Sequence, residues 1–241
     1  MIEVLLYIIV GLIAELIDSS LGMAYGVTST TLLLTIGFAP AVASSTTHYA
    51  EIFLTASSGL SHIKLGNFDK KLFLDLVVFG TISAIIGAYL LSEVSIPCLK
   101  TLVTLYLMMM GGVIILRALQ KNIVFRRVNT KVLAAIGGFM DAIGGGGWGP
   151  IVTSTLVANG YDVKKTIGSV NTAEFFVTIS QSIVFLLLVG VKYPLAVIGI
   201  LIGGLPAALI GAYITKKVKR KYLMFAVGTA LIVTNIIRFL R

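Results

Sequence analysis

Charged residues and cysteine are both scarce in this sequence of 241 residues. Only 12% of the residues are charged, 57% are hydrophobic, and the mean hydropathy is +1.02. A soluble core of this size cannot bury so much apolar surface, so the composition indicates an integral membrane protein. The apolar runs have the length of helices rather than of the shorter alternating segments of a membrane barrel, which predicts an all-α fold.

The single cysteine, Cys98, excludes an intramolecular disulfide and a cysteine-rich metal or iron–sulfur site. The sequence also lacks a Walker A motif, HExxH and GxSxG, so it gives no indication of ATP drive, of a cofactor or of an enzyme. The net charge of +9 comes from clusters of Lys and Arg between apolar runs. Such clusters orient a chain in the bilayer, so they do not indicate a nucleic-acid partner. With one cysteine and no HExxH motif, we also expect no metal site.

Several apolar runs each have about the 20 residues that cross a bilayer as a helix. They cover residues 42–63, 72–92, 98–117, 165–189, 194–215 and 222–240. Two further regions, 2–40 and 132–160, are too long for one plain span and too short for two, and each contains glycines and an Asp. The first residues lack a basic region and a small-residue cleavage site, which predicts a retained segment and not a removed signal.

Residues 18–57 align without a gap with residues 141–180 when they are shifted by 123, and one residue later in register the Gly-Ala-Tyr of 87–89 falls on that of 211–213. The shift places Asp18 on Asp141 and Glu51 on Glu174, and such acids are rare in membrane segments. It also pairs Gly22 with Gly145, Gly26 with Gly149, Thr30 with Thr153 and Gly37 with Gly160. We interpret the chain as a duplication, with a first repeat (1–120), a cytoplasmic basic linker (121–131) and a second repeat (132–241).

The orientation of the second repeat depends on whether the two interrupted regions cross the membrane or turn back within it. If they turn back, the 19 Lys and Arg residues divide 15 to 4 between the two sides, whereas a single crossing divides them 11 to 8. The positive-inside rule favours the first arrangement. The predicted fold is two inverted repeats, each a re-entrant broken-helix hairpin plus three full transmembrane helices, with both termini outside the cytoplasm.

The stretch DAIGGGGWGPIVTS (141–154) predicts a break in a helix at the centre of an apolar region. Pro150 suits the first turn of a new helix, and the amides around it would then bind an anion at the positive end of the helix dipole. The candidate residues are Gly145, Gly146, Gly147 and Trp148, with Gly22 and Gly26 as a weaker copy in the first repeat. The alternative is that these glycines only allow helices to pack closely.

Neutral polar residues at the starts of two spans complete the candidate site. His48 and Asn171 hold equivalent positions in the two repeats. The uncharged donors suited to an oxyanion are Thr46, Thr47, His48, Ser169, Asn171 and Thr172. A packing role explains His48 equally well.

Buried acids are expensive in a bilayer and usually face a pathway or a partner. The four candidates are Asp18, Glu51, Asp141 and Glu174. Because ionised carboxylates would repel an anion, these acids either bond the amides of the broken segments or carry a coupling proton. We favour the first role for the Asp pair and leave both roles open for the Glu pair. His48 is the first candidate for a coupling group, since imidazole titrates nearest neutrality.

The paired patterns DSSLGMAYGVTSTTLL with SSTTHYAEIF, and DAIGGGGWGPIVTSTLV with GSVNTAEFF, resemble the sulfite exporter TauE/SafE family of membrane permeases. The resemblance covers essentially the whole chain. It implies transport of sulfite, sulfonates or related organosulfur anions, with the family's Gly-rich segments at 22–26 and 144–150. Met23 and Ala24 depart from this pattern, because the second repeat has glycines at the matching positions.

These observations predict a secondary transporter of a small sulfur-containing anion across the cytoplasmic membrane, with the anion bound between the N-termini of the re-entrant half-helices. An anion channel of the same fold is the alternative. An intramembrane enzyme is a third interpretation, but no nucleophile–base pair is evident in the sequence. The expected partners are the small anion and the lipid bilayer, with proton coupling and the oligomeric state left open.

Overall fold

The computed structural model describes residues 2–21, 23–93, 99–119, 128–217 and 220–240, and within these ranges it contains helices and no strand. The elements are α1 (Ile2–Leu21), α2 (Tyr25–Thr35), α3 (Pro40–Lys64), α4 (Lys70–Glu93), α5 (Leu99–Ala118), α6 (Thr130–Gly144), a turn of π-helix η1 (Gly149–Thr153), α7 (Ser154–Ala158), α8 (Val163–Leu188), α9 (Pro194–Lys217) and α10 (Arg220–Phe239). Helices α4, α5, α8 and α10 are long and apolar enough to cross a membrane. The prediction of an all-α membrane protein is therefore confirmed.

Local sequence explains where several helices begin and end. The side chain of Asn129 accepts hydrogen bonds from two backbone N–H groups at the start of α6, and the side chain of Asp162 accepts one, from Lys165, at the start of α8. Pro40 and Pro194 are the first residues of α3 and α9, where a missing N–H costs nothing. Glycines with positive φ follow five of the helices: Gly37, Gly66, Gly145, Gly160 and Gly190.

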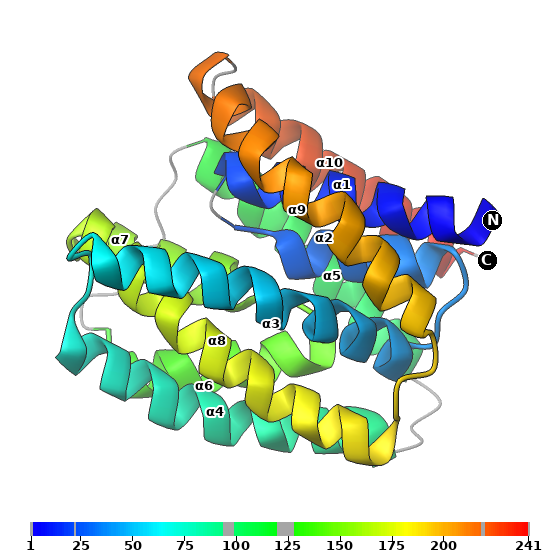
Figure 1. Ribbon diagram of the computed structural model, residues 1–241, viewed down its shortest axis with the longest axis horizontal. Coiled ribbons are helices and arrows are strands. Elements are labelled where there is room, and N and C mark those ends of the chain that lie inside the picture. The colour runs from blue at the N-terminus through cyan, green and yellow to red at the C-terminus, as the bar shows by residue number, and fades with distance from the viewer. Residues whose placement is uncertain (1, 22, 94–98, 120–127, 218–219, 241) are drawn as a thin grey trace.

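The helices form two groups around a pair of short central segments (Figure 1). In one group α4 packs against α6 and α8, and α8 packs against α3. In the other group α1 packs against α9, and α5 against α10. Segments α2 and η1 lie between the groups, because each contacts helices of both. The start of α1 and the end of α10 lie at the same end of the bundle.

Glycines set the closest contacts between these helices. A Cβ atom at Gly11 on α1 would collide with the backbone of Ile200 on α9. Gly111 on α5 and Gly228 on α10 face one another, and a Cβ on either would lie 2.7 or 2.6 Å from the carbonyl oxygen of the other. Inside a bilayer, apolar side chains gain nothing by leaving lipid for a neighbouring helix, so close packing of small residues is what joins the helices.

In both interrupted regions the segment after the break ends near the beginning of the helix before it. The ring of Phe38, which follows α2, lies 5.9 Å from that of Tyr7 near the start of α1 and 4.4 Å from that of Tyr193. The chain therefore returns to the level at which α1 began. In the second region, Leu156 on α7 packs in one apolar cluster with Ala134 near the start of α6.

The breaks differ in detail between the two regions. Gly145, Gly146 and Gly147 have φ values of 67°, 149° and 152°, which favour glycine. Ala24, which matches Gly147 in the sequence repeat, has φ = 91° and is the one non-glycine with positive φ among the described residues. Helix α1 has 20 residues and is longer than the half-helix that we expected, because no Gly or Pro stands between residues 12 and 21 to end it sooner.

Neighbouring glycines on α5 provide a test of this packing. We expect Gly111→Ala to lower the thermal stability of the purified protein by the equivalent of about 1–3 kcal/mol, since the new methyl group is forced against the Gly228 carbonyl. Gly112→Ala is the matched control, because a Cβ there meets nothing within 4 Å, and it should leave stability unchanged or raise it. Thermal unfolding in detergent measures both variants, and equal effects at the two positions would contradict the close α5–α10 contact.

Candidate functional site

A carboxylate holds each of the two breaks in the same way. The backbone N–H of Tyr25 donates to Asp18 Oδ1 at 2.9 Å, and the backbone N–H of Trp148 donates to Asp141 Oδ1 at 3.0 Å. In each case the acid lies seven residues before the donor, near the end of the first helix, and the donor lies at the start of the next segment. The two Asp side chains therefore satisfy amides that a broken helix leaves without an intrahelical partner.

The two breaks cross at the centre of the molecule. A Cβ on Gly26 would lie 2.5 Å from the Cα of Gly146, so the backbones touch there without a side chain between them. The Thr30 hydroxyl donates to the Gly145 carbonyl at 2.6 Å, and the Tyr106 hydroxyl donates to the Gly146 carbonyl at 2.7 Å. These glycines thus have the packing role that was the alternative to anion binding, and they have it whether or not an anion also binds nearby.

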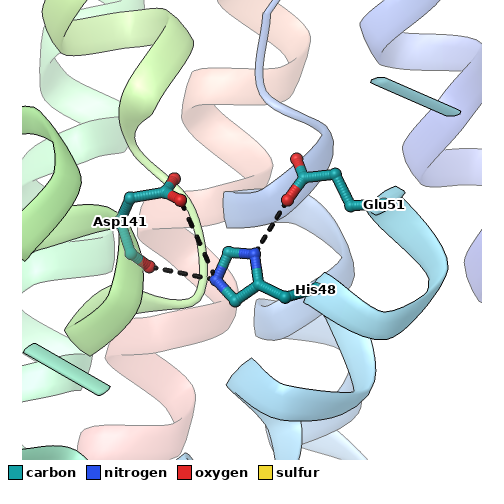
Figure 2. Close-up of side chains that lie close together, drawn as sticks. All are labelled: His48, Glu51 and Asp141. Carbon is teal, nitrogen blue, oxygen red and sulfur yellow. Dashed lines mark hydrogen bonds and ion pairs between the residues drawn. The ribbon is translucent and has the colours of Figure 1, made fainter. Parts of the chain in front are cut away.

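Beside this crossing lies a buried cluster in which His48 and Glu51 of α3 approach Asp141 of α6 (Figure 2), and Gln181 of α8 joins them. His48 Nδ1 lies 2.8 Å from Glu51 Oε2, and His48 Nε2 lies 3.3 Å from the backbone carbonyl oxygen of Asp141 and 3.9 Å from its Oδ2. The Gln181 amide nitrogen lies 3.1 Å from His48 Nδ1 and donates to Asp141 Oδ2 at 2.8 Å. His48 and Gln181 are fully buried, so their interactions are sheltered from water.

The cluster has more than one hydrogen-bonding arrangement. His48 Nδ1 carries one hydrogen or none, so it cannot donate to an ionised Glu51 and accept from Gln181 at the same time. Moving one proton between Glu51 and His48 changes which contact is satisfied. The same three side chains, His48, Glu51 and Asp141, also place ligand atoms within 4.8 Å of one another, which suits a metal ion, although hydrogen bonds account for their positions.

A cavity of about 540 Å³ adjoins the cluster and the crossing. Both breaks contribute to its wall through Ala24, Gly26, Gly147 and Gly149. Its ionisable acids are Glu15, Asp18, Glu51, Asp141 and Glu174. Among the described residues that line it there is no Lys or Arg. The cavity reaches His62 near the C-terminal end of α3, and Phe53 and Leu205 border it on the lipid-exposed surface.

The structure places some of the predicted site residues on this cavity and others away from it. Those on its wall are Asp18, Gly26, Glu51, Asp141, Gly146, Gly147, Asn171 and Glu174. Gly22 lies outside the described residues. Trp148 points away, because its ring is fully buried in an apolar cluster and its Nε1–H donates to the Val170 carbonyl at 3.2 Å. His48 sits behind the wall in the cluster described above.

The predicted hydroxyl donors are engaged inside the protein instead. Thr47 Oγ1 shares a hydrogen bond with Thr30, Ser169 accepts from the backbone N–H of Asp69, and Thr172 donates to the carbonyl of its own helix four residues earlier. Thr46 is buried and, like Thr47, Ser169, Thr172 and Gly145, does not line the cavity. Each of these groups is therefore placed for helix packing in this conformation.

Three important residues were missed by the sequence interpretation. Glu15 is a cavity acid one helical turn before Asp18, and its place inside the first apolar segment was the available signal. Gln181 could have been found as an amide in the middle of an apolar span. Tyr106 carried no comparable signal, because a tyrosine among apolar residues is common in membrane helices.

An all-helical membrane bundle with broken segments around a central polar cavity has the architecture of a membrane permease. The chain belongs to the sulfite exporter TauE/SafE family, which it matches over residues 7–237. It is 40% identical over 245 residues to the probable membrane transporter protein YtnM of Bacillus subtilis (strain 168), an alignment that covers 97% of this chain and 81% of YtnM. No solved structure matches it. The resemblance noted in the sequence is confirmed, and the protein is a multi-pass membrane transporter of this family.

The two Asp residues differ in how many donors they satisfy, which predicts different costs of removal. Asp141→Ala leaves the Trp148 amide and the Gln181 side chain without their acceptor, whereas Asp18→Ala removes the acceptor of the Tyr25 amide. At about 1–3 kcal/mol for each buried donor left unpaired, Asp141→Ala should be the more destabilising change. Thermal unfolding of the two purified variants measures the difference, and a larger loss at Asp18 would contradict the described bonding.

Proposed function

We propose that this protein is a secondary transporter of a small sulfur-containing anion, such as sulfite or a sulfonate, and that the anion occupies the cavity between the two breaks. The observation that carries the proposal is the position of that cavity. Its wall includes Tyr25 and Gly149, the first residues of α2 and η1, so the N-terminal ends of two helical segments reach it. Helix N-termini attract anions without a Lys or Arg in the membrane.

Repeated hydrogen bonds support the proposed inverted repeats. The Tyr25–Asp18 bond becomes the Trp148–Asp141 bond when both residue numbers are shifted by 123. The contacts between helices are also repeated in the two halves. Helix α1 packs on α9, the last helix but one of the second repeat, and α6 packs on α4, the last helix but one of the first.

A pair of bonds between α3 and α8 gives further support for the same arrangement. Asn171 donates to Ser58 at 2.8 Å, and Gln181 lies 3.1 Å from His48. The shift of 123 turns Asn171 into His48 and Ser58 into Gln181, so each bond is the image of the other. Such an exchange is expected of two repeats related by a two-fold axis between α3 and α8, an arrangement common among secondary transporters.

The distribution of basic residues orients the proposed transporter. We place Lys64, Lys70 and Lys131 in the cytoplasm, following the 15 to 4 division of positive charge, and both termini on the outer side of the cell membrane. The cavity reaches His62, two residues before Lys64, so this conformation is the one open toward the cytoplasm. Export or import would each use this conformation for one half of the cycle.

The acids around the cavity place a condition on the cargo. An anion entering among ionised carboxylates would be repelled, and the described residues that line the cavity include no Lys or Arg to offset this repulsion. Protons bound by these acids remove the conflict. We therefore propose that the anion is carried together with at least one proton, held by Glu51, Glu174 or the adjoining His48.

Counterflow in proteoliposomes tests the proposed transport. Vesicles that contain the purified protein and unlabelled sulfite should take up labelled sulfite transiently, with a rate that saturates, because a carrier exchanges bound substrate. Sulfate and small sulfonates, tested as competitors, define the preferred anion. Uptake that rises in proportion to concentration without saturation would support the channel alternative, and absence of uptake for every sulfur anion tested would refute the proposed substrate class.

Proton coupling predicts a pH dependence that specific variants should weaken. Anion affinity should increase as the pH falls, approaching about tenfold per pH unit if one proton is taken up with the anion. Glu51→Gln and Glu174→Gln, which are permanently neutral, should flatten this dependence, as should His48→Gln. Glu93→Gln is the matched control, because Glu93 lies exposed at the end of α4 away from the cavity. The measurement is the anion affinity of each variant at several pH values. If all three variants keep the parent's dependence of affinity on pH, none of these groups binds the coupled proton.

A further inference from the structure

The cavity is one-sided, although the repeats suggest two equivalent access routes. Its wall toward the cytoplasmic end is formed in part by Ser58, His62, Ile167 and Asn171. The shift of 123 converts these positions into Gln181, Phe185, Ser44 and His48. All four of the converted residues are fully buried, at 0% exposure. Equivalent positions in the two repeats therefore form a cavity wall toward one end of the protein and a fully buried core toward the other.

We propose that Ser44, His48, Gln181 and Phe185 line a second access path, which is closed in this conformation and opens on the opposite face of the membrane. The inference rests on the inverted repeats of the proposed function. Ser44 and His62 lie near opposite ends of α3, which runs from Pro40 to Lys64. The closed path therefore leads from the central acids toward the face opposite Lys64.

Larger side chains fill the closed path at three of the four positions. His48, Gln181 and Phe185 stand where the open path has Asn171, Ser58 and His62. The rings of His48 and Phe185 lie parallel, at an interplanar angle of 6° and a centroid distance of 6.2 Å. This stack spans α3 and α8 and occupies the space that the open path leaves free.

Hydrogen bonds fasten the same residues to the second break. Gln181 donates to Asp141 and lies within hydrogen-bonding distance of His48, and the Ser44 hydroxyl donates to the Ala142 carbonyl at 2.7 Å. At the equivalent place on the open side, Asn171 and Ser58 share one hydrogen bond. Opening the closed path requires α3 and α8 to separate from α6 here, which releases Asp141 from His48 and Gln181, whereas Glu51 stays beside His48 on α3. Ser44, His48, Gln181 and Phe185 form the gate of the closed path, and Gln181 bonds this gate directly to Asp141, one of the acids on the cavity wall.

Exchanging residues between the two paths tests the proposal without any substrate. In a Cys98→Ala background, single probes Ser44→Cys and Ile167→Cys report the closed and open paths to a membrane-impermeant maleimide added to oriented vesicles. Ile167→Cys should react from the face that bears Lys64, and Ser44→Cys should react slowly from either face. Adding His48→Asn with Gln181→Ser should raise the labelling rate of Ser44→Cys about tenfold, from the opposite face only. The double substitution removes the bonds of Gln181 with His48 and Asp141, and losing their net contribution should shift the equilibrium toward the open path by about that factor.

The reverse exchange keeps the test decisive if the first variant does not fold. Asn171→His with Ser58→Gln should lower the labelling of Ile167→Cys, since the larger side chains fill the open path. Leu60→Ile with Ile183→Leu is the control, because these repeat-equivalent residues are exposed and lie outside both paths. Labelling of Ser44→Cys from the Lys64 face, or unchanged rates in a folded exchange variant, would overturn the gate. Absence of sulfur-anion transport with the expected labelling would overturn the proposed substrate and leave the gate intact.

Discussion

The centre of this protein depends on one close approach of backbone to backbone, where Gly26 in the first break meets Gly146 in the second. Broken helices are tolerated in a membrane only where protein or a cavity shields their polar groups. Here each broken end supplies the shield for the other, and hydroxyls from Thr30 and Tyr106 bond the carbonyls beside the crossing. A side chain at the contact would separate the breaks, and the cavity walls that both contribute would separate with them. Glycine is therefore required at both positions because no side chain fits between the two backbones.

That constraint also explains why acids gather at the centre. Each break leaves amides that need an acceptor, and a carboxylate is the strongest acceptor the chain can offer. Asp18 and Asp141 fill this need, and further acids from α1, α3 and α8 face the same space. The result is a cavity that is attractive to an anion through its helix ends and repellent through its carboxylates. Protonation of the acids would remove this repulsion for the anion proposed above, so the acids that the broken helices require also support the proposal that protons move with the cargo.

The all-helical fold and the positions of the two breaks could be predicted from the sequence, because the apolar runs and the residues shared by the two halves are visible there. The shift that aligns Asp18 with Asp141 also relates the hydrogen bonds of Ser58 and His48, although those bonds join helices far apart in the chain. The positions of the breaks followed from Gly and Pro. The use of individual hydroxyls did not follow, because Thr47 and Ser169 are as suited to a helix neighbour as to an anion, and only packing decides between them. Trp148 is similar, since a ring beside a flexible turn can point to either side of it.

The two halves differ at positions that line or border the cavity. Glu15 lines the cavity, but its equivalent Gly138 packs against the Gly80 carbonyl, and Gln181 replaces Ser58. Two identical inverted repeats would give two conformations of equal free energy, each the image of the other. Gln181 bonds both His48 and Asp141, whereas its equivalent Ser58 bonds Asn171, so the additional bond to Asp141 favours the conformation in which that side is closed. A difference of about 1.4 kcal/mol already shifts such an equilibrium tenfold. On the proposed mechanism, the repeats provide two routes to one site, and the differences between them would determine which route is open at rest.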